Sequence, residues 1–228
     1  MLYRWEHEGV VVYRSPVLDA LDIPHAFGTR LGDDAGIAQV LDLAGREWVR
    51  TRQVHGHAVH LPEKGIRHLS TECDADAVVL RDAGQVTRVL TADCVPVLLA
   101  AADGSAVAAV HAGWRGFVSG VLAEAVDALE SRFVAAIGPC IGVRRFEVGE
   151  EVAERFDPRF VRRDLGGRPH VDLRAAAHAQ LHRLGAQRID TTDRCTAEHE
   201  DEFFSHRRDV TQRQLESTGR MASVIALR

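Results

Sequence analysis

The sequence predicts a mixed α/β or α+β fold, and three observations lead to this prediction. Short apolar runs typical of buried strands alternate irregularly with amphipathic segments of helical periodicity. The chain has 228 residues, of which 46% are hydrophobic and 27% charged, as in globular proteins. No repeat or low-complexity linker is visible in a chain long enough to bury a substantial core. We therefore expect several connections that cross the faces of a sheet.

The expected strands are compact runs of Val, Ile, Leu and Ala bounded by polar residues or glycine. The first of them is expected to be an edge strand. In chain order they are residues 10–14, 77–80, 87–90, 95–99, 106–110, 133–137 and 223–227, with Ile189 in a further short strand.

Three segments have the pattern of helices. Residues 117–129 carry apolar side chains at 118, 121, 122, 125, 126 and 129, which is the spacing of one helix face. Residues 148–156 look helical, and Pro158 follows their end. A helix over 173–184 is expected to begin at the cap Asp172 and to stop at Gly185. Residues 33–36 are expected to form a turn or loop.

Charge and cysteine content exclude several classes of partner. The net charge is −5 and the isoelectric point is near 6.2, so the sequence lacks the excess of positive charge that is typical of nucleic-acid-binding proteins. No apolar run approaches the roughly 18 residues of a membrane span, and the first residues lack the apolar core of a secretory signal. We expect a cytoplasmic protein whose four widely spaced cysteines stay reduced. Since Lys64 is the only lysine, arginines supply nearly all positive charge and suit phosphate or carboxylate.

Two histidines and one thiol beside strand-like sequence form a candidate metal site. His111 follows the apolar run 106–110 and opens the motif His-Ala-Gly-Trp-Arg-Gly, while Cys94 and His55 lie beside other such runs. Catalytic zinc keeps three protein ligands and an open position, and a thiolate favours such a borderline-soft ion. On residue chemistry alone, a solvent-facing His55 and a buried, inert Cys94 are at least as well supported.

A nucleophilic cysteine competes with the metal for the same atoms. Cys94 and His111 would form a thiolate–imidazole pair with Asp93 as an orienting group. Metal content distinguishes the two hypotheses. A cytidine-type deaminase is disfavoured because Cys140 follows a proline but lacks the second cysteine of Pro-Cys-x-x-Cys. A blue-copper carrier is disfavoured because neither methionine lies near the cysteines and histidines.

A series of motifs runs along nearly the whole chain. The motifs that open with Thr91-Ala-Asp-Cys94 and His111-Ala-Gly-Trp-Arg-Gly116 are together highly specific. The other segments of the series are 53–56, 74–77, 137–142, 146–149, 171–173, 195–196, 203–209 and 218–220. In this order the motifs resemble one known family, the YfiH-type purine nucleoside phosphorylases, also named laccase-domain or multicopper polyphenol oxidoreductase proteins.

The resemblance implies an α+β fold in which residues 1–228 form a single layered α/β/β/α domain with mixed sheets. It implies one zinc held by the residues matching His55, Cys94 and His111, with copper as the alternative suggested by the oxidoreductase name. It also implies phosphorolysis of adenosine, inosine and methylthioadenosine, together with deamination of adenosine. Purine nucleosides and phosphate are then the partners. One element departs from the family, since residues 25–32 read His-Ala-Phe-Gly-Thr-Arg-Leu-Gly and residues 32–53 are shortened.

Phosphorolysis requires positive charge to hold phosphate, and a guanidinium matches phosphate bidentately. Arg30 is the leading candidate for this substrate-binding role, and Arg115 and Arg207 are weaker candidates. For each of them an ordinary ion pair is the more common role of an arginine.

Three other residues beside these motifs have two interpretations each, and His206 has one. Asp93 is expected to accept a hydrogen bond from a ligand histidine or to cap a turn. Trp114 would stack on a purine or, more often for such a residue, pack in the core. Cys140 would line the pocket or be a structural thiol. His206, next to Arg207, is expected to close the cleft from the C-terminal side.

Overall fold

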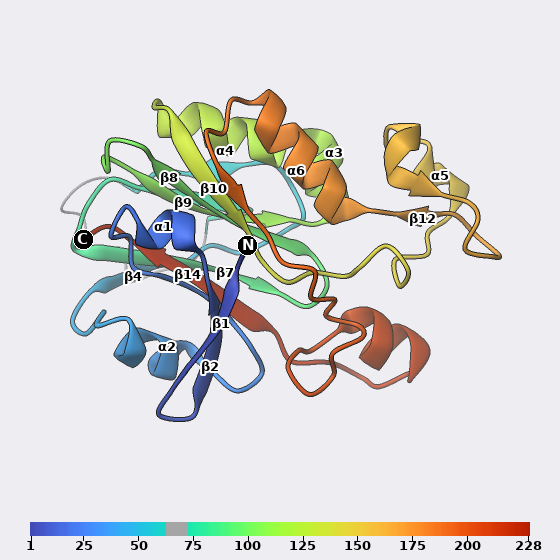
Figure 1. Cartoon of the computed structure of the whole chain (residues 1–228), viewed down its shortest axis with the longest axis horizontal. Coiled ribbons are helices and arrows are strands. Elements are labelled where there is room, and N and C mark those ends of the chain that lie inside the picture. Colours follow the sequence, from blue (N-terminus) through green and yellow to red (C-terminus); the bar gives the residue numbers. More distant parts are fainter. Residues whose placement is uncertain (63–72) are drawn as a thin grey trace.

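The computed structural model describes residues 1–62 and 73–228, and its centre is a pair of six-stranded sheets (Figure 1). The first sheet has the order β1-β2-β3-β14-β7-β4 and consists of β1 (Tyr3–His7), β2 (Val10–Arg14), β3 (His25–Gly28), β4 (Glu47–Val49), β7 (Gln85–Thr91) and β14 (Met221–Ala226). The second has the order β13-β10-β8-β9-β6-β5 and consists of β5 (Val59–His60), β6 (Ala77–Leu80), β8 (Val95–Ala101), β9 (Val107–Ala112), β10 (Phe133–Ile137) and β13 (Ile189–Asp190).

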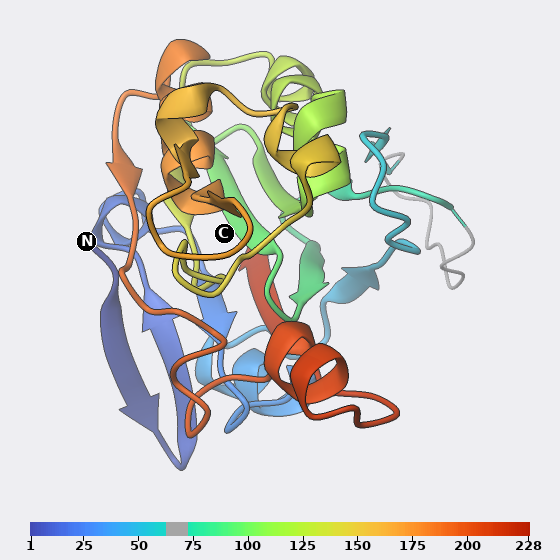
Figure 2. The same ribbon diagram turned by 90° about the vertical axis from the view of Figure 1, so that its right-hand side faces the viewer.

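Helices and a small ribbon lie outside these sheets. The α-helices are α1 (Pro16–Asp19), α2 (Asp34–Val40), α3 (Trp114–Ser119), α4 (Val121–Leu129), α5 (Glu150–Ala153) and α6 (Leu173–Arg183). A 3-10 turn η1 (Pro158–Phe160) precedes the ribbon of β11 (Val161–Arg162) and β12 (His170–Val171). A π-helix, η2 (Arg207–Gln212), lies near the same end of the sheets as α5 (Figures 1 and 2).

Three apolar layers confirm the predicted α/β/β/α arrangement. The central layer lies between the sheets and joins residues such as Phe27 and Ile225 of the first sheet to Leu98 of the second. One outer layer packs α4 and α6 on the second sheet, with Leu122 and Leu181 fully buried. The other packs α2 on the first sheet. Both sheets are mixed, since β4–β7, β5–β6 and β10–β13 are parallel pairs and the other pairs are antiparallel.

All the predicted strands are present; those over 10–14, 77–80 and 133–137 have the predicted bounds, and the ends of the others are shifted. The prediction of an edge strand over 10–14 is wrong, because β1 pairs with β2 and occupies the edge itself. The strand predicted over 106–110 is β9, which starts at Val107, includes His111 and ends at Ala112, so this imidazole projects from within the sheet. β8 has all seven residues buried, since it lies between the first sheet and the helices.

The helices differ from the prediction where local backbone chemistry intervenes. The helix expected over 117–129 is broken by Gly120, whose φ of +99° ends α3 and starts α4. The loop expected over 33–36 is instead the start of α2, because the Asp33 side chain accepts a hydrogen bond from the Gly36 amide. The helix expected over 148–156 has only the four residues of α5. Asp172 caps α6 as predicted.

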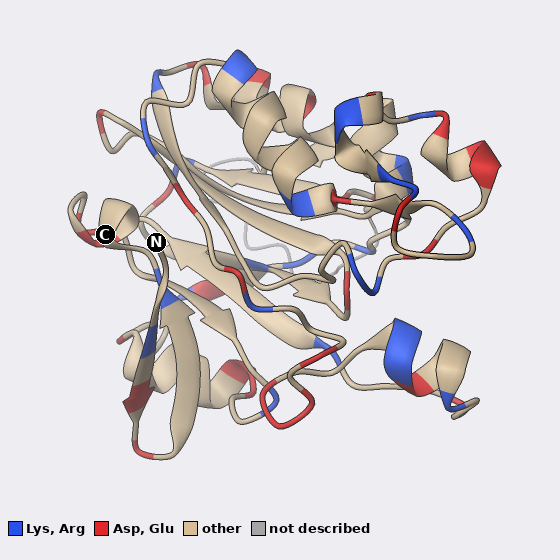
Figure 3. Cartoon of the chain, turned by 45° about the vertical axis from the view of Figure 1, so that its right-hand side comes forward, with Lys and Arg blue, Asp and Glu red and all other residues tan. Residues whose placement is uncertain are grey.

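Charged residues lie mainly on the helices, on loops and on outer faces, and few lie on the strands of the second sheet (Figure 3). All four cysteines are free thiols. Among the described residues, no helix is long and apolar enough to span a bilayer.

Candidate metal centre and pocket

His55, Cys94 and His111 converge on one point although they are far apart in sequence. One ligand atom of each lies within 4.8 Å of the others, and the two imidazole centroids are 4.9 Å apart. Cys94 directly precedes β8 and His111 lies next to it on β9, where His111 pairs with Pro96. Among the described residues, these three form the one group of three or more metal-ligating side chains that meet in this way. The group can therefore bind one metal ion.

Asp76, directly before β6, holds both histidines in place. Its Oδ1 accepts hydrogen bonds from His111 Nδ1 at 2.7 Å and from the His55 backbone amide at 3.0 Å. Its Oδ2 accepts from the amides of Gly56 at 2.7 Å and Val54 at 3.2 Å. These bonds stabilise the left-handed backbone of His55, whose φ is +61°. With Nδ1 donating to the carboxylate, Nε2 of His111 is left with its lone pair free for a metal.

Two glycines of the His-Ala-Gly-Trp-Arg-Gly motif are required by close approach. A Cβ on Gly113 would lie 2.8 Å from His55 Cδ2 and 3.2 Å from Cys94 Sγ, inside the ligand group. A Cβ on Gly116 would lie 2.5 Å from the Gly56 carbonyl oxygen. The motif therefore allows the start of α3 to pack directly against the loop that carries His55.

The electrostatics of the three side chains fit a cation better than a free nucleophile. Burial lowers the pKa of His55, and the neighbouring His111 lowers it further, so the His55 imidazole favours its neutral form. Burial raises the pKa of the Cys94 thiol to about 12, and the carboxylate of Asp93 adds to this effect. A thiolate at this position therefore needs a positive charge such as a bound metal ion.

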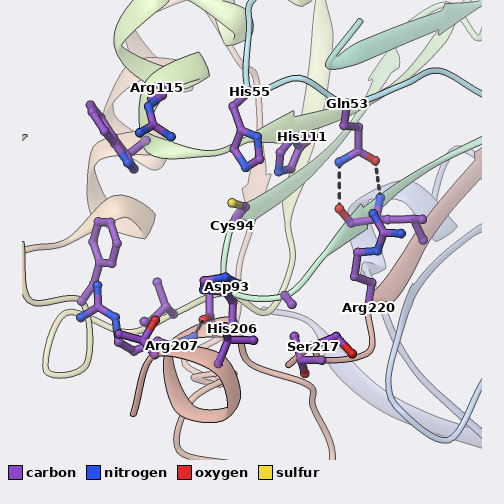
Figure 4. Close-up of a pocket in the computed structure, with 18 of the residues that line it drawn as sticks. Gln53, His55, Asp93, Cys94, His111, Arg115, His206, Arg207, Ser217 and Arg220 are labelled. Atoms are coloured by element: carbon purple, nitrogen blue, oxygen red, sulfur yellow. Dashed lines mark hydrogen bonds between the residues drawn. The ribbon is translucent and has the colours of Figure 1, made fainter. Parts of the chain in front are cut away.

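The ligand group opens into a pocket of about 740 Å³ (Figure 4). Arg115, Arg207 and Arg220 line it, and no ion pair between described residues includes any of the three. The guanidinium of Arg115 lies 4.8 Å from the ring centre of Trp114, and that of Arg207 lies 5.5 Å from the ring centre of Phe146. The pocket thus combines a metal-binding group with guanidinium charges that have no carboxylate partner.

The expectation that Arg30 is the leading phosphate ligand is corrected by the structure. Arg30 does not line the pocket. Its Nη1 donates to the Glu200 carbonyl, and its guanidinium stacks on Phe204 at 4.7 Å. The weaker candidates Arg115 and Arg207 are the ones that reach the pocket, since they follow His111 and His206 in the two motifs.

Of the two roles expected for Asp93, the hydrogen bond to a ligand histidine is not made among the described residues. The Asp93 carboxylate accepts hydrogen bonds from Thr196 Oγ1 at 2.6 Å, Ser205 Oγ at 3.0 Å and the Arg207 amide at 2.7 Å. Asp93 therefore fastens the C-terminal segment to the start of β8, and the residue that holds the ligand histidine is Asp76.

The remaining predicted residues divide between the pocket and the core. Trp114 belongs to both, since it lines the pocket and packs against the outer apolar layer between the second sheet and its helices. His206 is exposed and lines the pocket beside Arg207, as expected for a C-terminal wall. Cys140 is buried and is absent from the pocket wall, which fits a structural thiol.

Sequence reasoning did not single out three residues that the structure places at the site. Asp76 and Arg220 were each inside a recognised motif, but no role followed from residue type alone. Gln53 bonds to Leu90 in both directions, accepting from its amide at 2.7 Å and donating to its carbonyl at 2.8 Å (Figure 4). This pairing fixes the loop before His55 to β7, a long-range contact that no local pattern reveals.

Comparison with known proteins agrees with this geometry. A family profile described as multi-copper polyphenol oxidoreductase laccase matches residues 33–228. The chain belongs to this family. Its relatives include the purine nucleoside phosphorylase YfiH of Escherichia coli, which is 41% identical over 185 residues covering 77% of this chain and 72% of that protein. A purine nucleoside phosphorylase of Deinococcus radiodurans is 33% identical over 96% of this chain and 94% of its own length. The resemblance to YfiH-type proteins drawn from the motifs is thereby confirmed.

Two solved structures share the fold. YlmD from Geobacillus stearothermophilus superposes with a TM-score of 0.83 at 26% identity, over 99% of this chain and 98% of that one. The Bacillus licheniformis protein YfiH superposes with a TM-score of 0.82 at 23% identity, over 98% of both chains.

Proposed function

We propose that this protein is a zinc-dependent purine nucleoside phosphorylase. The observation that carries the proposal is a single pocket that joins the His55–Cys94–His111 group to arginines free of ion pairs. Relatives named purine nucleoside phosphorylase support the activity. Adenosine, inosine and methylthioadenosine are the proposed substrates, with deamination of adenosine as a second activity.

The donor set fits zinc. Two neutral imidazole nitrogens and one thiolate are typical ligands of a catalytic zinc with an open position, and Asp76 supplies the carboxylate that such a histidine usually has behind it. When bound, zinc supplies a Lewis acid in the pocket and the means to activate water for deamination. Copper remains the alternative that the family description suggests, and metal analysis decides between them.

In phosphorolysis, the arginines of the pocket would bind the attacking phosphate. A phosphate oxygen forms a bond to C1′ of the ribose while the C1′–N9 bond breaks, and its electron pair leaves with the purine, which takes up a proton. The guanidiniums of Arg115 and Arg207 would hold the phosphate by charge-assisted hydrogen bonds. Because Asp93 binds the Arg207 amide, it would fix the position of this charge relative to Cys94.

A cytoplasmic location belongs to the proposal, because a thiol ligand must stay reduced to bind metal. So does the organisation of residues 1–228 as one domain, since core layers join strands from both ends of the chain.

Metal content and phosphate dependence test the proposal together. Protein purified without added metal is analysed for zinc and copper, and inosine is then incubated with and without phosphate. We expect about one zinc per chain and hypoxanthine release only with phosphate. Cleavage of esters or amides without metal would instead support a Cys94–His111 hydrolase. Binding of nucleosides with no product in either buffer would reject the enzyme and leave a binding protein.

A further inference from the structure

The positive charge around the pocket exceeds what one inorganic phosphate requires. Arg115 and Arg207 lie on one side of the ligand group in Figure 4, and Arg220 lies on the other, toward Gln53 and Ser217. The proposed function uses Arg115 and Arg207 for inorganic phosphate, and it assigns no anion to Arg220 on the other side of the ligand group. Arg220 is therefore available to bind a second anion.

Arg220 belongs to a basic cluster on the outer face of the first sheet, formed with Arg50 and Arg88. Arg220 directly precedes β14, whose Val224 pairs with Arg88 of β7. Arg50 follows Val49 of β4, which pairs with Thr87, so Arg50 comes beside Arg88. The three arginines thus extend from β4 across β7 to the pocket rim.

One carboxylate serves two members of this cluster. Asp34 lies 3.0 Å from Arg88 Nη1 and 3.6 Å from Arg50 Nη2. Burial lowers the pKa of Arg88, and the nearby positive charges of Arg50 and Arg220 lower it further. The carboxylate of Asp34 raises this pKa but does not outweigh them. Nε of Arg88 is buried and has no hydrogen-bond partner among the described residues. The cluster keeps an excess of positive charge that an anion would neutralise.

The pocket wall on this side offers little to neutralise Arg220. Glu216 and Asp93 are the carboxylates among the residues that line the pocket. Asp93 is committed to hydrogen bonds with Thr196, Ser205 and Arg207, and no ion pair joins Glu216 to Arg220 among the described residues. The guanidinium of Arg220 is therefore available to pair with a bound anion.

We propose that Arg220, with Arg88 and Arg50 behind it, forms a second phosphate subsite, so that the pocket accepts a purine nucleoside that carries a phosphate on its ribose. This inference rests on the proposed function for the purine and for the use of Arg115 and Arg207 by inorganic phosphate. A volume of about 740 Å³ is ample for a nucleoside monophosphate beside a free phosphate. Arg220 is then a specificity-determining residue.

Calorimetric titration of the purified metal-loaded protein with inosine and with inosine 5′-monophosphate tests the inference, in buffer without inorganic phosphate. We expect the monophosphate to bind about tenfold more tightly or better, as charge-assisted hydrogen bonds allow. Arg220→Gln should reduce this ratio to about one while inosine binding changes less than about twofold, and Arg220→Lys should restore part of the ratio. Arg132→Gln is the matched control, because this exposed arginine lies at the opposite end of β8 from Cys94.

Three outcomes would overturn the inference. Equal affinity of the wild-type protein for both ligands would remove the subsite. If Arg207→Gln, and not Arg220→Gln, removed the preference for the monophosphate over inosine, the ribose phosphate would bind on the Arg207 side of the pocket. In a separate titration with inorganic phosphate alone, an Arg220→Gln variant that weakens only this binding would assign the subsite to the free anion. Absence of base release from inosine with phosphate would reject the proposed function alone, because these binding ratios do not depend on turnover.

Discussion

Replacement of Asp76 by asparagine tests whether one buried carboxylate builds the metal centre. Asp76 is completely buried, and each of its oxygens accepts two hydrogen bonds, from His111, His55, Gly56 and Val54. Asp76→Asn keeps one acceptor oxygen and turns an amide nitrogen toward two N–H donors. About two hydrogen bonds to a charged group are lost, at roughly 1.5 to 3 kcal/mol each. We therefore expect a loss of about 4 kcal/mol in the free energy of unfolding.

The same substitution should weaken metal binding. Burial would raise the pKa of Asp76, but hydrogen bonds from His111 and the Gly56 amide outweigh it and lower the pKa, so the carboxylate is charged at neutral pH. Without this charge, Nε2 of His111 is a weaker electron-pair donor to a metal ion. Loss of such a carboxylate partner typically costs about 10- to 100-fold in metal affinity. Competition with a chromophoric chelator measures the zinc affinity of the folded protein, and urea unfolding measures stability.

Asp74→Asn provides the matched control. Asp74 lies two residues earlier and is exposed, with an ion pair to Arg52 at the surface. Its replacement should leave zinc affinity unchanged and stability nearly so. Wild-type zinc affinity in Asp76→Asn, or equal effects of the two substitutions, would refute the role given to Asp76.

Four further predictions concern other parts of the molecule. Cys94→Ser should lose zinc and purine release together, and full activity in zinc-free Cys94→Ser protein would reject the metal hypothesis. Gly113→Ala should displace His55 and lower zinc affinity at least tenfold on the chelator assay, because its Cβ would lie 2.8 Å from that ring. Arg30→Ala should leave the phosphate dependence of base release unchanged, and a raised phosphate requirement would return Arg30 to the site. His25 is buried with its pKa lowered to about 4, chiefly by desolvation, so its neutral form stabilises the fold above the ordinary pKa of 6.5. The contribution of His25 to the free energy of unfolding should fall by about 3 kcal/mol as the pH drops from 6.5 to 4. Urea unfolding at several pH values measures this loss, and His25→Gln should lack it.

The strands were predictable because burial on both faces leaves a continuous apolar run in the sequence. β8 and β10 are such runs, and their positions followed from composition alone. The break at Gly120 was not predictable from periodicity, since the apolar positions continue through it while the backbone turns to φ +99°. The edge position given to β2 failed for a related reason. β1 has mostly exposed side chains, so it lacks the apolar signal that marks a strand.

The ligand group was predictable only from residue type together with the motifs of a known family, because residue chemistry alone supports a solvent-facing His55 and an inert Cys94 at least as well. The residues that support it were not, because their roles depend on which way a side chain faces. Asp74 and Asp76 are the same residue type two positions apart, yet one is exposed and the other holds two histidines. Arg30 and Arg220 are likewise indistinguishable by type, and only the fold brings one of them to the pocket.

The two buried aspartates divide the site into a metal side and a substrate side. Asp76 precedes β6 and fastens the loop that carries His55, while Asp93 adjoins Cys94 and fastens the segment that carries Arg207. Each carboxylate therefore couples one wall of the pocket to the end of a buried strand. Asp93→Asn should accordingly raise the phosphate concentration needed for half-maximal base release and leave zinc affinity nearly unchanged, the reverse of the pattern expected for Asp76→Asn. If both variants lost zinc equally, the two walls would not be independent, and the site would have to be treated as one cooperative network around the metal.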